Sequence, residues 1–357
     1  RHLAVARSRR LAAALVGHLT PRGLSFATCA FLFFLSPSFH TDFTMTHLDT
    51  PQLRSLSRRF LLASAAALAL LGSHAHATDK LPVTASFSIL GDLVRVVGGD
   101  RVAVTTLVGP NEDAHVFEAK PADAKTLLAS RLVVTNGLGF EPWVGKLIKS
   151  AGYKGEVVVA AKGVKGRHME EGKGHASHGH EETDPHAWQN PNNVVVYVRN
   201  IAAGLSKVDA AGASTYQTNA EAYVKELQAL DTWTKEQIAA IPAAKRKVIT
   251  SHDAFGYFSA QYGVTFLAPQ GVNTETEPSA KQVAQLIKQI QREKIRAVFV
   301  ENMSNPKLIA QLSKDAGANL GASLYADALS ASDQPGATYL QMMRHNVTQL
   351  VAGMKNN

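Results

Sequence analysis

Cysteine is almost absent from this sequence, since Cys29 is the only one among 357 residues. A single cysteine excludes an intrachain disulfide and any zinc site built from several thiolates. Cys29 also precedes the short apolar run 31–35 instead of ending it, which argues against a lipid-attachment cysteine. A His-Glu-x-x-His motif is missing as well, so the helical zinc-peptidase signature is excluded. A metal site in this chain has to use imidazole and oxygen ligands.

The net positive charge is small once the first 77 residues are set aside. The whole chain has 37 basic and 29 acidic residues, a formal net charge of +8. Residues 1–77 hold eight arginines and two acidic residues, which leaves 29 basic and 27 acidic residues, or +2, for the rest. A nucleic-acid partner is therefore not expected. The remaining 280 residues are enough for a substantial core, more naturally in two lobes than in one.

Residues 54–77 have the pattern of a secretory signal peptide. Arginines precede an apolar run at 60–71, and small residues flank a cleavage site that ends at Ala77. The run is too short to span a membrane. Paired Arg58 and Arg59 fit a twin-arginine export signal, and an ordinary Sec signal that carries two arginines fits equally well. Either route predicts a periplasmic protein.

The start of the chain is interpreted separately. The sequence begins with Arg1, and Met45 begins a leader of ordinary length at 45–77. We interpret residues 1–44 as upstream sequence or a misplaced start, and we exclude residues 1–77 from the fold prediction.

Strand-like and helix-like runs alternate in both halves of the remaining chain. Strands are predicted at 81–87, 102–108, 131–135, 156–160, 247–250, 264–268, 296–301 and 322–325. Helices are predicted at 89–97, 121–129, 140–150, 194–205, 254–262, 279–293, 306–316 and 339–354. This alternation predicts an α/β fold in which each half has a mainly parallel sheet flanked by helices.

Two segments between the halves are different. Residues 161–191 are rich in Gly, Glu and His without apolar periodicity, which predicts a mobile surface insertion. Residues 213–240 form one uninterrupted helical stretch on the order of 40 Å long, enough to run along both lobes; a core helix within one lobe is the alternative. We therefore predict an N-terminal lobe at 78–207, a linking helix at 208–241 and a C-terminal lobe at 242–357.

Four residues with metal-binding side chains border strand-like runs: His115, His186, His252 and Asp327. Ligand sites of open α/β sheets lie at the carboxyl ends of strands. Each residue alone is better explained as a solvated or helix-capping side chain. Together they place ligands at strand ends of both halves, as in a cleft closed by two lobes.

Three imidazoles and one carboxylate suit zinc, with bonds of about 2.0–2.2 Å. Four protein ligands fill a tetrahedral shell and leave no position for a catalytic water, which favours binding over hydrolysis. Asp184 and Asp253 lie next to two of the histidines in sequence and could orient their rings, or could serve as turn and capping residues.

At this point the sequence resembles the metal-binding components of bacterial ABC importers for zinc and manganese, of the zinc-uptake type. The resemblance is carried by GPNEDAHVFEAKPAD (109–123), TNGLGFEPW (135–143), DPHAWQNP (184–191), TSHDAFGYF (250–258), EPSAKQV (277–283), VENMSNP (300–306) and LYADALS (324–330). It implies two α/β lobes joined by a rigid long helix, with the ion held between them by the same four residues. It also implies a permease and an ATPase as partners of a monomeric, non-enzymatic carrier.

The third histidine bears on the metal. Manganese-preferring relatives typically carry glutamate at the position of His252, and nitrogen ligands favour zinc over manganese. Some relatives with three histidines and one aspartate also take manganese, so Mn²⁺ stays the alternative to Zn²⁺. Glu301 is the second candidate for an oxygen ligand, although a cleft-lining or hydrogen-bonding role fits it better.

A histidine-rich loop at 165–183 contains His168, His175, His178 and His180. Such tracts bind metals weakly and exchange them quickly, which favours auxiliary zinc capture or sensing over a solvated linker. Two further functions remain open at this point, a zinc hydrolase and an adhesin or scaffold in which the metal is structural.

Overall fold

The computed structural model describes residues 79–168 and 183–357. The predicted extension at 1–44, the predicted signal peptide and most of the histidine-rich loop lie outside these ranges. Within the described residues, no helix combines the length and the apolar character that crossing a bilayer requires.

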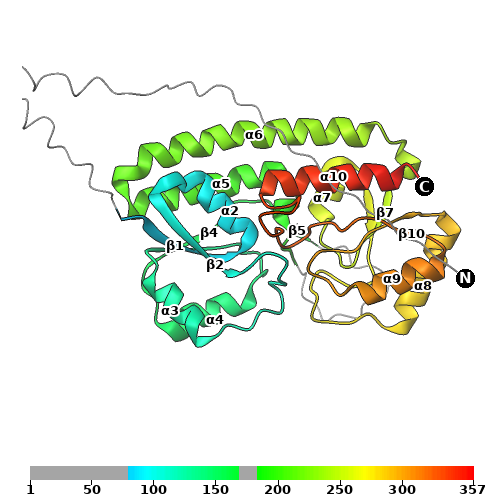
Figure 1. The fold of residues 1–357 in the computed structure, drawn as a ribbon, viewed down its shortest axis with the longest axis horizontal. Helices are drawn as coiled ribbons and strands as arrows, with labels where there is room; N and C mark the ends of the chain where they lie inside the picture. The colour runs from blue at the N-terminus through cyan, green and yellow to red at the C-terminus, as the bar shows by residue number, and fades with distance from the viewer. Residues whose placement is uncertain (1–78, 169–182) are drawn as a thin grey trace, which may run out of the picture. The chain divides into compact units, whose positions relative to one another are not determined.

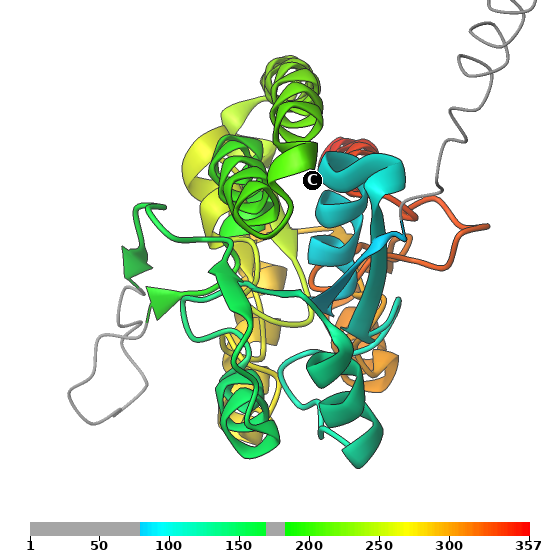
Figure 2. The same cartoon turned by 90° about the vertical axis from the view of Figure 1, so that its left-hand side faces the viewer.

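The first half of the described chain forms a four-stranded parallel sheet in the order β2-β1-β3-β4. Its strands are β1 (Leu81–Phe87), β2 (Val102–Val108), β3 (Leu132–Thr135) and β4 (Glu156–Val159). Its helices are α2 (Ser88–Gly98), α3 (Pro121–Ala129), α4 (Pro142–Ala151) and α5 (Pro191–Val208). Figures 1 and 2 show α3 and α4 on one side of this sheet and α2 and α5 on the other.

Both faces of this sheet are buried, and β3 shows why the strand has no polar side. Val133 packs with Leu127 of α3 and Leu147 of α4, whereas its neighbours Leu132 and Val134 join the main core on the opposite face. A strand covered on both faces reads as a continuous apolar run. The continuous apolar residues of β3 therefore allow helices to pack on both faces of the sheet.

The second half repeats this arrangement with the strand order β10-β9-β7-β8, again all parallel. Its strands are β7 (Lys247–Ile249), β8 (Thr265–Leu267), β9 (Ala297–Val298) and β10 (Asn319–Leu320). Its helices are α7 (Gly256–Tyr262), α8 (Ala280–Glu293), α9 (Pro306–Ala316) and α10 (Tyr339–Met354). Apolar side chains of α8 and α9 pack on Ile249 and Val298 to form a separate core.

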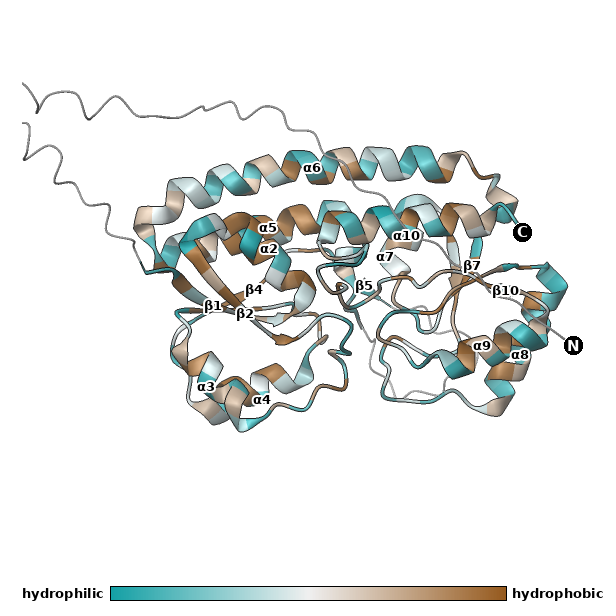
Figure 3. Ribbon diagram, viewed as in Figure 1, coloured by the Kyte–Doolittle hydropathy of each residue, from teal (hydrophilic) through white to brown (hydrophobic). Residues whose placement is uncertain are grey.

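The long helix α6 (Ala213–Ala239) joins the two lobes, as predicted. It packs on α2 and α5 of the first lobe and on α7 and α10 of the second (Figure 1). Hydrophobic and hydrophilic residues are mixed along its whole length, as expected for a helix with one buried face (Figure 3). Arg344 of α10 lies 5.0 Å above the ring of Trp233 of α6, which adds a cation–π contact to the apolar seam.

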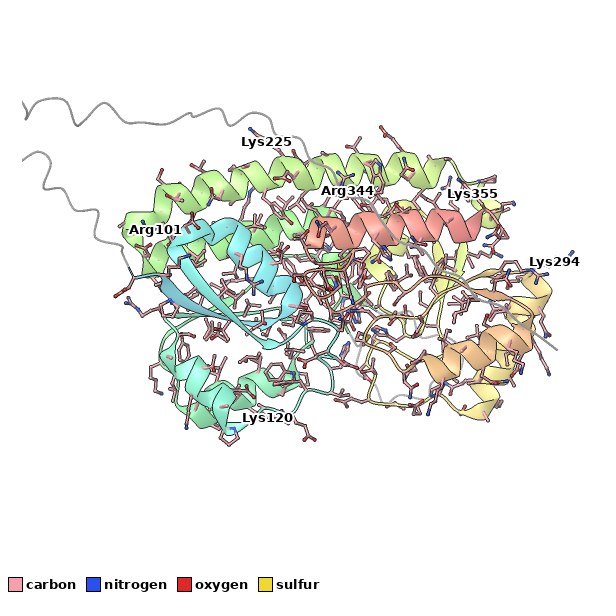
Figure 4. All side chains as sticks on the ribbon, viewed as in Figure 1. Arg101, Lys120, Lys225, Lys294, Arg344 and Lys355 are labelled. Carbon is pink, nitrogen blue, oxygen red and sulfur yellow. The ribbon has the colours of Figure 1, made fainter. Side chains whose placement is uncertain are left out.

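Basic side chains are spread over the described surface. Figure 4 shows the labelled Arg101, Lys120, Lys225, Lys294 and Lys355 at separate places on the periphery of the ribbon. The labelled basic side chains therefore do not gather in one patch, and the sequence gives residues 78–357 a net charge of only +2.

The predicted strand at 322–325 is wrong. The fourth strand of the second sheet is β10, and of residues 322–325 only Leu324 pairs, in an isolated bridge with Glu301. The backbone of Tyr325 instead bonds to a side chain, because its N–H donates to Asn346 Oδ1 at 2.9 Å and its carbonyl accepts from Asn346 Nδ2 at 2.7 Å. This segment leaves the sheet and carries the next residues toward the cleft.

The prediction of a mobile surface insertion at 161–191 is wrong in its last part. Arg167–His168 (β5) pairs antiparallel with Thr183–Asp184 (β6), and a short 3₁₀ turn follows at Ala187–Gln189. Asp184, His186 and Trp188 are fully buried. The loop-like composition therefore ends before a segment that is folded into the interior.

Candidate metal centre

The four residues singled out from the sequence meet at one place between the two lobes. His115 follows β2, His186 follows β6, His252 follows β7 and Asp327 follows β10. One ligand atom from each side chain lies within 4.8 Å of all the others, and all four side chains are buried. They form the group of His, Cys, Asp and Glu side chains in the described ranges that could hold a metal ion.

The distances between these atoms are those of a coordination shell. His115 Nε2 lies 3.3 Å from His186 Nε2 and 3.3 Å from Asp327 Oδ2. His252 Nε2 lies 3.0 Å from Asp327 Oδ2, and His186 Nε2 lies 3.6 Å from Asp327 Oδ1. Tetrahedral ligands at bonds of about 2.0–2.1 Å are spaced roughly 3.3–3.4 Å apart. The site can therefore accept a four-coordinate ion with little movement.

Several polar atoms of the site have no hydrogen-bond partner in the protein. These atoms are both carboxylate oxygens of Asp327 and Nε2 of His252, and all three are buried. A buried polar atom without a partner is costly, and a buried charge more so. Because these atoms point at one another around a common centre, the arrangement fits a cation between them.

Asp184 fixes the ring of His186. Its Oδ1 accepts from the backbone N–H of His186 at 3.0 Å and faces His186 Nδ1 at 2.9 Å. An Nδ1–H that donates to a carboxylate leaves the Nε2 lone pair free for a metal. The predicted orienting role of Asp184 therefore agrees with the geometry.

Glu301, and not the predicted Asp253, holds the ring of His252. Its Oε1 accepts from the backbone N–H groups of Ser251 at 2.9 Å and His252 at 3.1 Å, and its Oε2 contacts His252 Nδ1. Glu301 thus lies behind the histidine, on the side away from the cluster of Nε2 atoms. The hydrogen-bonding role predicted for Glu301 is confirmed, but its partner could not be foreseen because the two residues are 49 positions apart.

Electrostatics within the cluster follow from this packing. Burial alone would lower the pKa of His252, but the carboxylates of Glu301 and Asp327 outweigh burial and hold it well above the ordinary value. Burial alone would raise the pKa of Asp327, but His252 and His186 hold it well below the ordinary value. Both shifts favour the charged forms of the two side chains in the metal-free site, protonated for His252 and ionised for Asp327.

Aromatic rings form the wall of the site on the side of the first lobe. Phe140 packs edge-on against His115 with ring centroids 4.7 Å apart, and Trp188 packs edge-on against His186 at 5.3 Å. The indole N–H of Trp188 and the amide of Gln189 both donate to the carbonyl of Ala326 at 2.9 Å. Trp188 thus forms part of the wall and also joins the loop of Asp327 to the opposite lobe.

Of the four histidines of the predicted auxiliary loop, His168 is the one that lies in the described residues. His168 lies on the exposed end of β5 and is not one of the four clustered residues. His175, His178 and His180 lie outside the described residues, so their predicted role stays a prediction.

Comparison with protein-family models gives a match over residues 83–353 to the family described as zinc-uptake complex component A, periplasmic. A manganese-binding lipoprotein, MntA of Halalkalibacterium halodurans, is 32% identical over 276 residues, which cover 77% of this chain and 89% of that protein. The iron-binding protein YfeA of Yersinia pestis is 31% identical over 311 residues, 86% of this chain and 98% of that protein.

Solved structures give the same result for the fold. The periplasmic zinc-binding protein TroA of Treponema pallidum has a TM-score of 0.71 and 27% identity, and the match covers 77% of this chain and 99% of that one. A manganese-bound periplasmic metal-binding protein of Candidatus Liberibacter asiaticus has a TM-score of 0.68 and 28% identity, with 77% and 100% covered. Similar chains therefore carry names that refer to three different metals.

Proposed function

The chain belongs to the family of the zinc-uptake complex component A, the periplasmic metal-binding proteins of ABC importers, and from this premise we propose that its cargo is Zn²⁺. In this proposal the protein captures the ion outside the cytoplasm and delivers it to an inner-membrane permease, whose ATPase drives import. His115, His186, His252 and Asp327 hold the ion. The observation that carries the proposal is the spacing of these four buried ligand atoms.

Zinc is preferred in this proposal because three of the four ligands are imidazole nitrogens. Nitrogen-rich tetrahedral sites suit Zn²⁺, whereas Mn²⁺ prefers more oxygen ligands and a higher coordination number. Manganese stays the alternative cargo, since several relatives are named for it. Only Asp327 contributes oxygen to the cluster, and it can supply a second oxygen if the shell expands.

A transport role is favoured over hydrolysis by the same shell. A catalytic zinc keeps one position for water or substrate. In this proposal the four side chains fill a tetrahedral shell, and three of them are wholly inaccessible to solvent. We therefore propose a monomeric carrier with no catalytic residues, exported by a signal peptide at 45–77 and built from lobes at 78–207 and 242–357 with the linking segment 208–241.

Metal competition on the exported part of the chain tests this proposal. Protein stripped of metal is offered equal concentrations of Zn²⁺ and Mn²⁺, and the bound metal is counted by elemental analysis after gel filtration. One zinc per chain is expected. His252→Ala should lose the zinc, whereas His345→Ala, whose ring bonds to the carbonyl of Ser323 away from the site, should keep it. Retention of zinc by His252→Ala, or preferential loading with manganese, would contradict the proposal.

A further inference from the structure

The exposed fractions of the four clustered side chains indicate the side from which an ion reaches the site. The side chains of His186, His252 and Asp327 have no exposed surface at all. The side chain of His115 is 5% exposed, so it alone among the four touches solvent. An ion that enters or leaves this site without unfolding it has to pass on the side of His115.

A solvent-connected pocket lies on that side. Its volume is about 420 Å³, and His115 forms part of its wall. Three loops make up the rest, at 138–142 and 183–185 from the first half of the chain and at 272–275 from the second. The pocket therefore lies where the two lobes meet, and its inner end is a metal ligand.

The chemistry of the lining suits a passage more than a second binding site. Apolar side chains such as Phe140, Pro185 and Val272 make about half of the wall, and polar atoms make the other half. Glu275, which is exposed, is the only carboxylate among the described residues that line the pocket. Its negative charge at the rim of a recessed pocket concentrates cations there and can replace one water of the hydrated ion. A lone carboxylate does not hold the ion, so transfer inward to His115 is not opposed.

The other flank of the site is closed by contacts between the lobes. A second pocket, of about 320 Å³, contains Asp113 and Thr274 but none of the four clustered residues. Thr274 Oγ1 donates to Asp113 Oδ2 at 2.6 Å, and Asp113 Oδ1 accepts from the backbone N–H of His115 at 2.9 Å. These bonds join the lobes between the second pocket and the cluster.

We infer that the metal ion enters and leaves through the pocket beside His115, with Glu275 at its rim as a transit ligand that is absent from the final shell. The inference rests on the proposed function and adds to it the path of the cargo. It also predicts that changes in the pocket affect the rates of zinc exchange, whereas changes of the four ligands affect the affinity. A bulky side chain in this pocket should change the rates of binding and release without changing the affinity, because a barrier on the path slows entry and exit by the same factor.

Stopped-flow measurements with Zn²⁺ test this path on the exported protein. Asn273→Trp places a large ring in the pocket, and Gln270→Trp places the same ring in the second pocket as a matched control. Asn273→Trp is expected to slow zinc association, and release to a chelator, by a common factor of about ten, since equal barriers leave the equilibrium unchanged. Gln270→Trp is expected to leave both rates near those of the parent.

The carboxylate is tested by Glu275→Gln, a surface change that does not endanger folding, against Glu277→Gln at the second pocket. Glu275→Gln should slow association several-fold at low salt, and the difference should shrink at high salt. The inference is overturned if Gln270→Trp slows exchange and Asn273→Trp does not, or if both glutamine variants load zinc at the parent rate. Loss of stoichiometric zinc binding by the parent itself would instead defeat the proposed function.

Discussion

Glu301 contacts Nδ1 of His252 while its other oxygen accepts two backbone N–H groups, from Ser251 and His252. One buried carboxylate therefore fixes both the ring and the backbone of a single metal ligand. Since Nδ1 faces Glu301, Nε2 faces Asp327 and can bind a metal ion once its proton has left. The third ligand of the proposed site thus depends on a residue that never touches the ion.

Glu301→Gln is expected to weaken zinc binding by roughly 10- to 100-fold, as loss of a ligand-orienting carboxylate does in other metal sites. The amide keeps the volume but loses the charge, and its NH₂ group cannot accept the backbone N–H bonds. Competition with a chromogenic chelator measures the change. Asp253→Asn is the matched control, because it removes a carboxylate next to His252 in sequence that does not hold the ring. A larger loss of affinity in Asp253→Asn than in Glu301→Gln would show that the orienting role is misassigned.

Zinc affinity is expected to fall as the pH falls, and to begin falling above the ordinary histidine pKa of 6.5. Glu301 and Asp327 hold the pKa of His252 well above that value, so at neutral pH a proton has to leave His252 before its Nε2 can bind metal. Calorimetry in buffers of different ionisation enthalpy should count about one proton released per zinc at neutral pH. Zinc binding without proton release would contradict the charge state inferred for His252.

The same pKa shifts predict the pH dependence of stability in the metal-free protein. The raised pKa of folded His252 stabilises the fold below about pH 6.5, and this contribution is lost as the pH rises through the folded pKa. The lowered pKa of Asp327 stabilises the fold above about pH 3.8, and this contribution is lost as the pH falls through its folded pKa. Urea unfolding should therefore show that His252 and Asp327 together raise the free energy of unfolding between about pH 3.8 and pH 6.5. This stabilisation should become smaller as the pH rises into the alkaline range. His252→Ala should flatten the alkaline side of the profile.

Removal of metal is expected to lower stability without unfolding the protein. One large apolar core includes residues of both lobes, each lobe has a smaller core of its own, and α6 packs on helices of both lobes; none of this packing needs an ion. Zinc at about 1,000 times its dissociation constant should add roughly 4 kcal/mol by mass action. Thermal unfolding with a chelator and with excess zinc measures this difference. Loss of cooperative unfolding in the chelator sample would instead favour a structural metal.

Much of the fold could be predicted because its signals are local. Proline at the first turn marks the starts of α3 and α9, and Ser279 caps α8 at the start of the helix predicted for residues 279–293. The strand predicted at 322–325 fails because Asn346, 21 positions away, takes the backbone bonds of Tyr325. No local pattern contains that information.

The site was predictable in part for the same reason. Each of the four clustered residues borders a strand-like run, which is visible in the sequence, but their approach to within 4.8 Å depends on how the lobes pack. The role of Glu301 depends on a neighbour 49 residues away. Residue types at strand ends therefore indicate the chemistry of the site, whereas tertiary contacts decide which carboxylate orients which ring.

Thr274→Val is expected to speed zinc release several-fold while changing association little. The hydroxyl of Thr274 donates to Asp113 across the cleft, and Asp113 in turn accepts from the backbone N–H of His115. Valine keeps the shape and removes the donor, so the loop of His115 loses one of its bonds to the second lobe, although Asn111 keeps its bonds to Leu329 and Asn302, and the closed site opens more often. Stopped-flow release to a chelator measures the effect, and Thr274→Ser, which keeps the hydroxyl, should behave like the parent.

The neighbouring positions Asn273 and Thr274 are expected to affect zinc exchange in different ways. A bulky ring at Asn273 should slow both association and release of zinc. Loss of the bond at Thr274 should accelerate release and weaken the affinity for zinc by the same factor. An unchanged release rate in Thr274→Val would mean that the contact between Thr274 and Asp113 does not hold the ion in place.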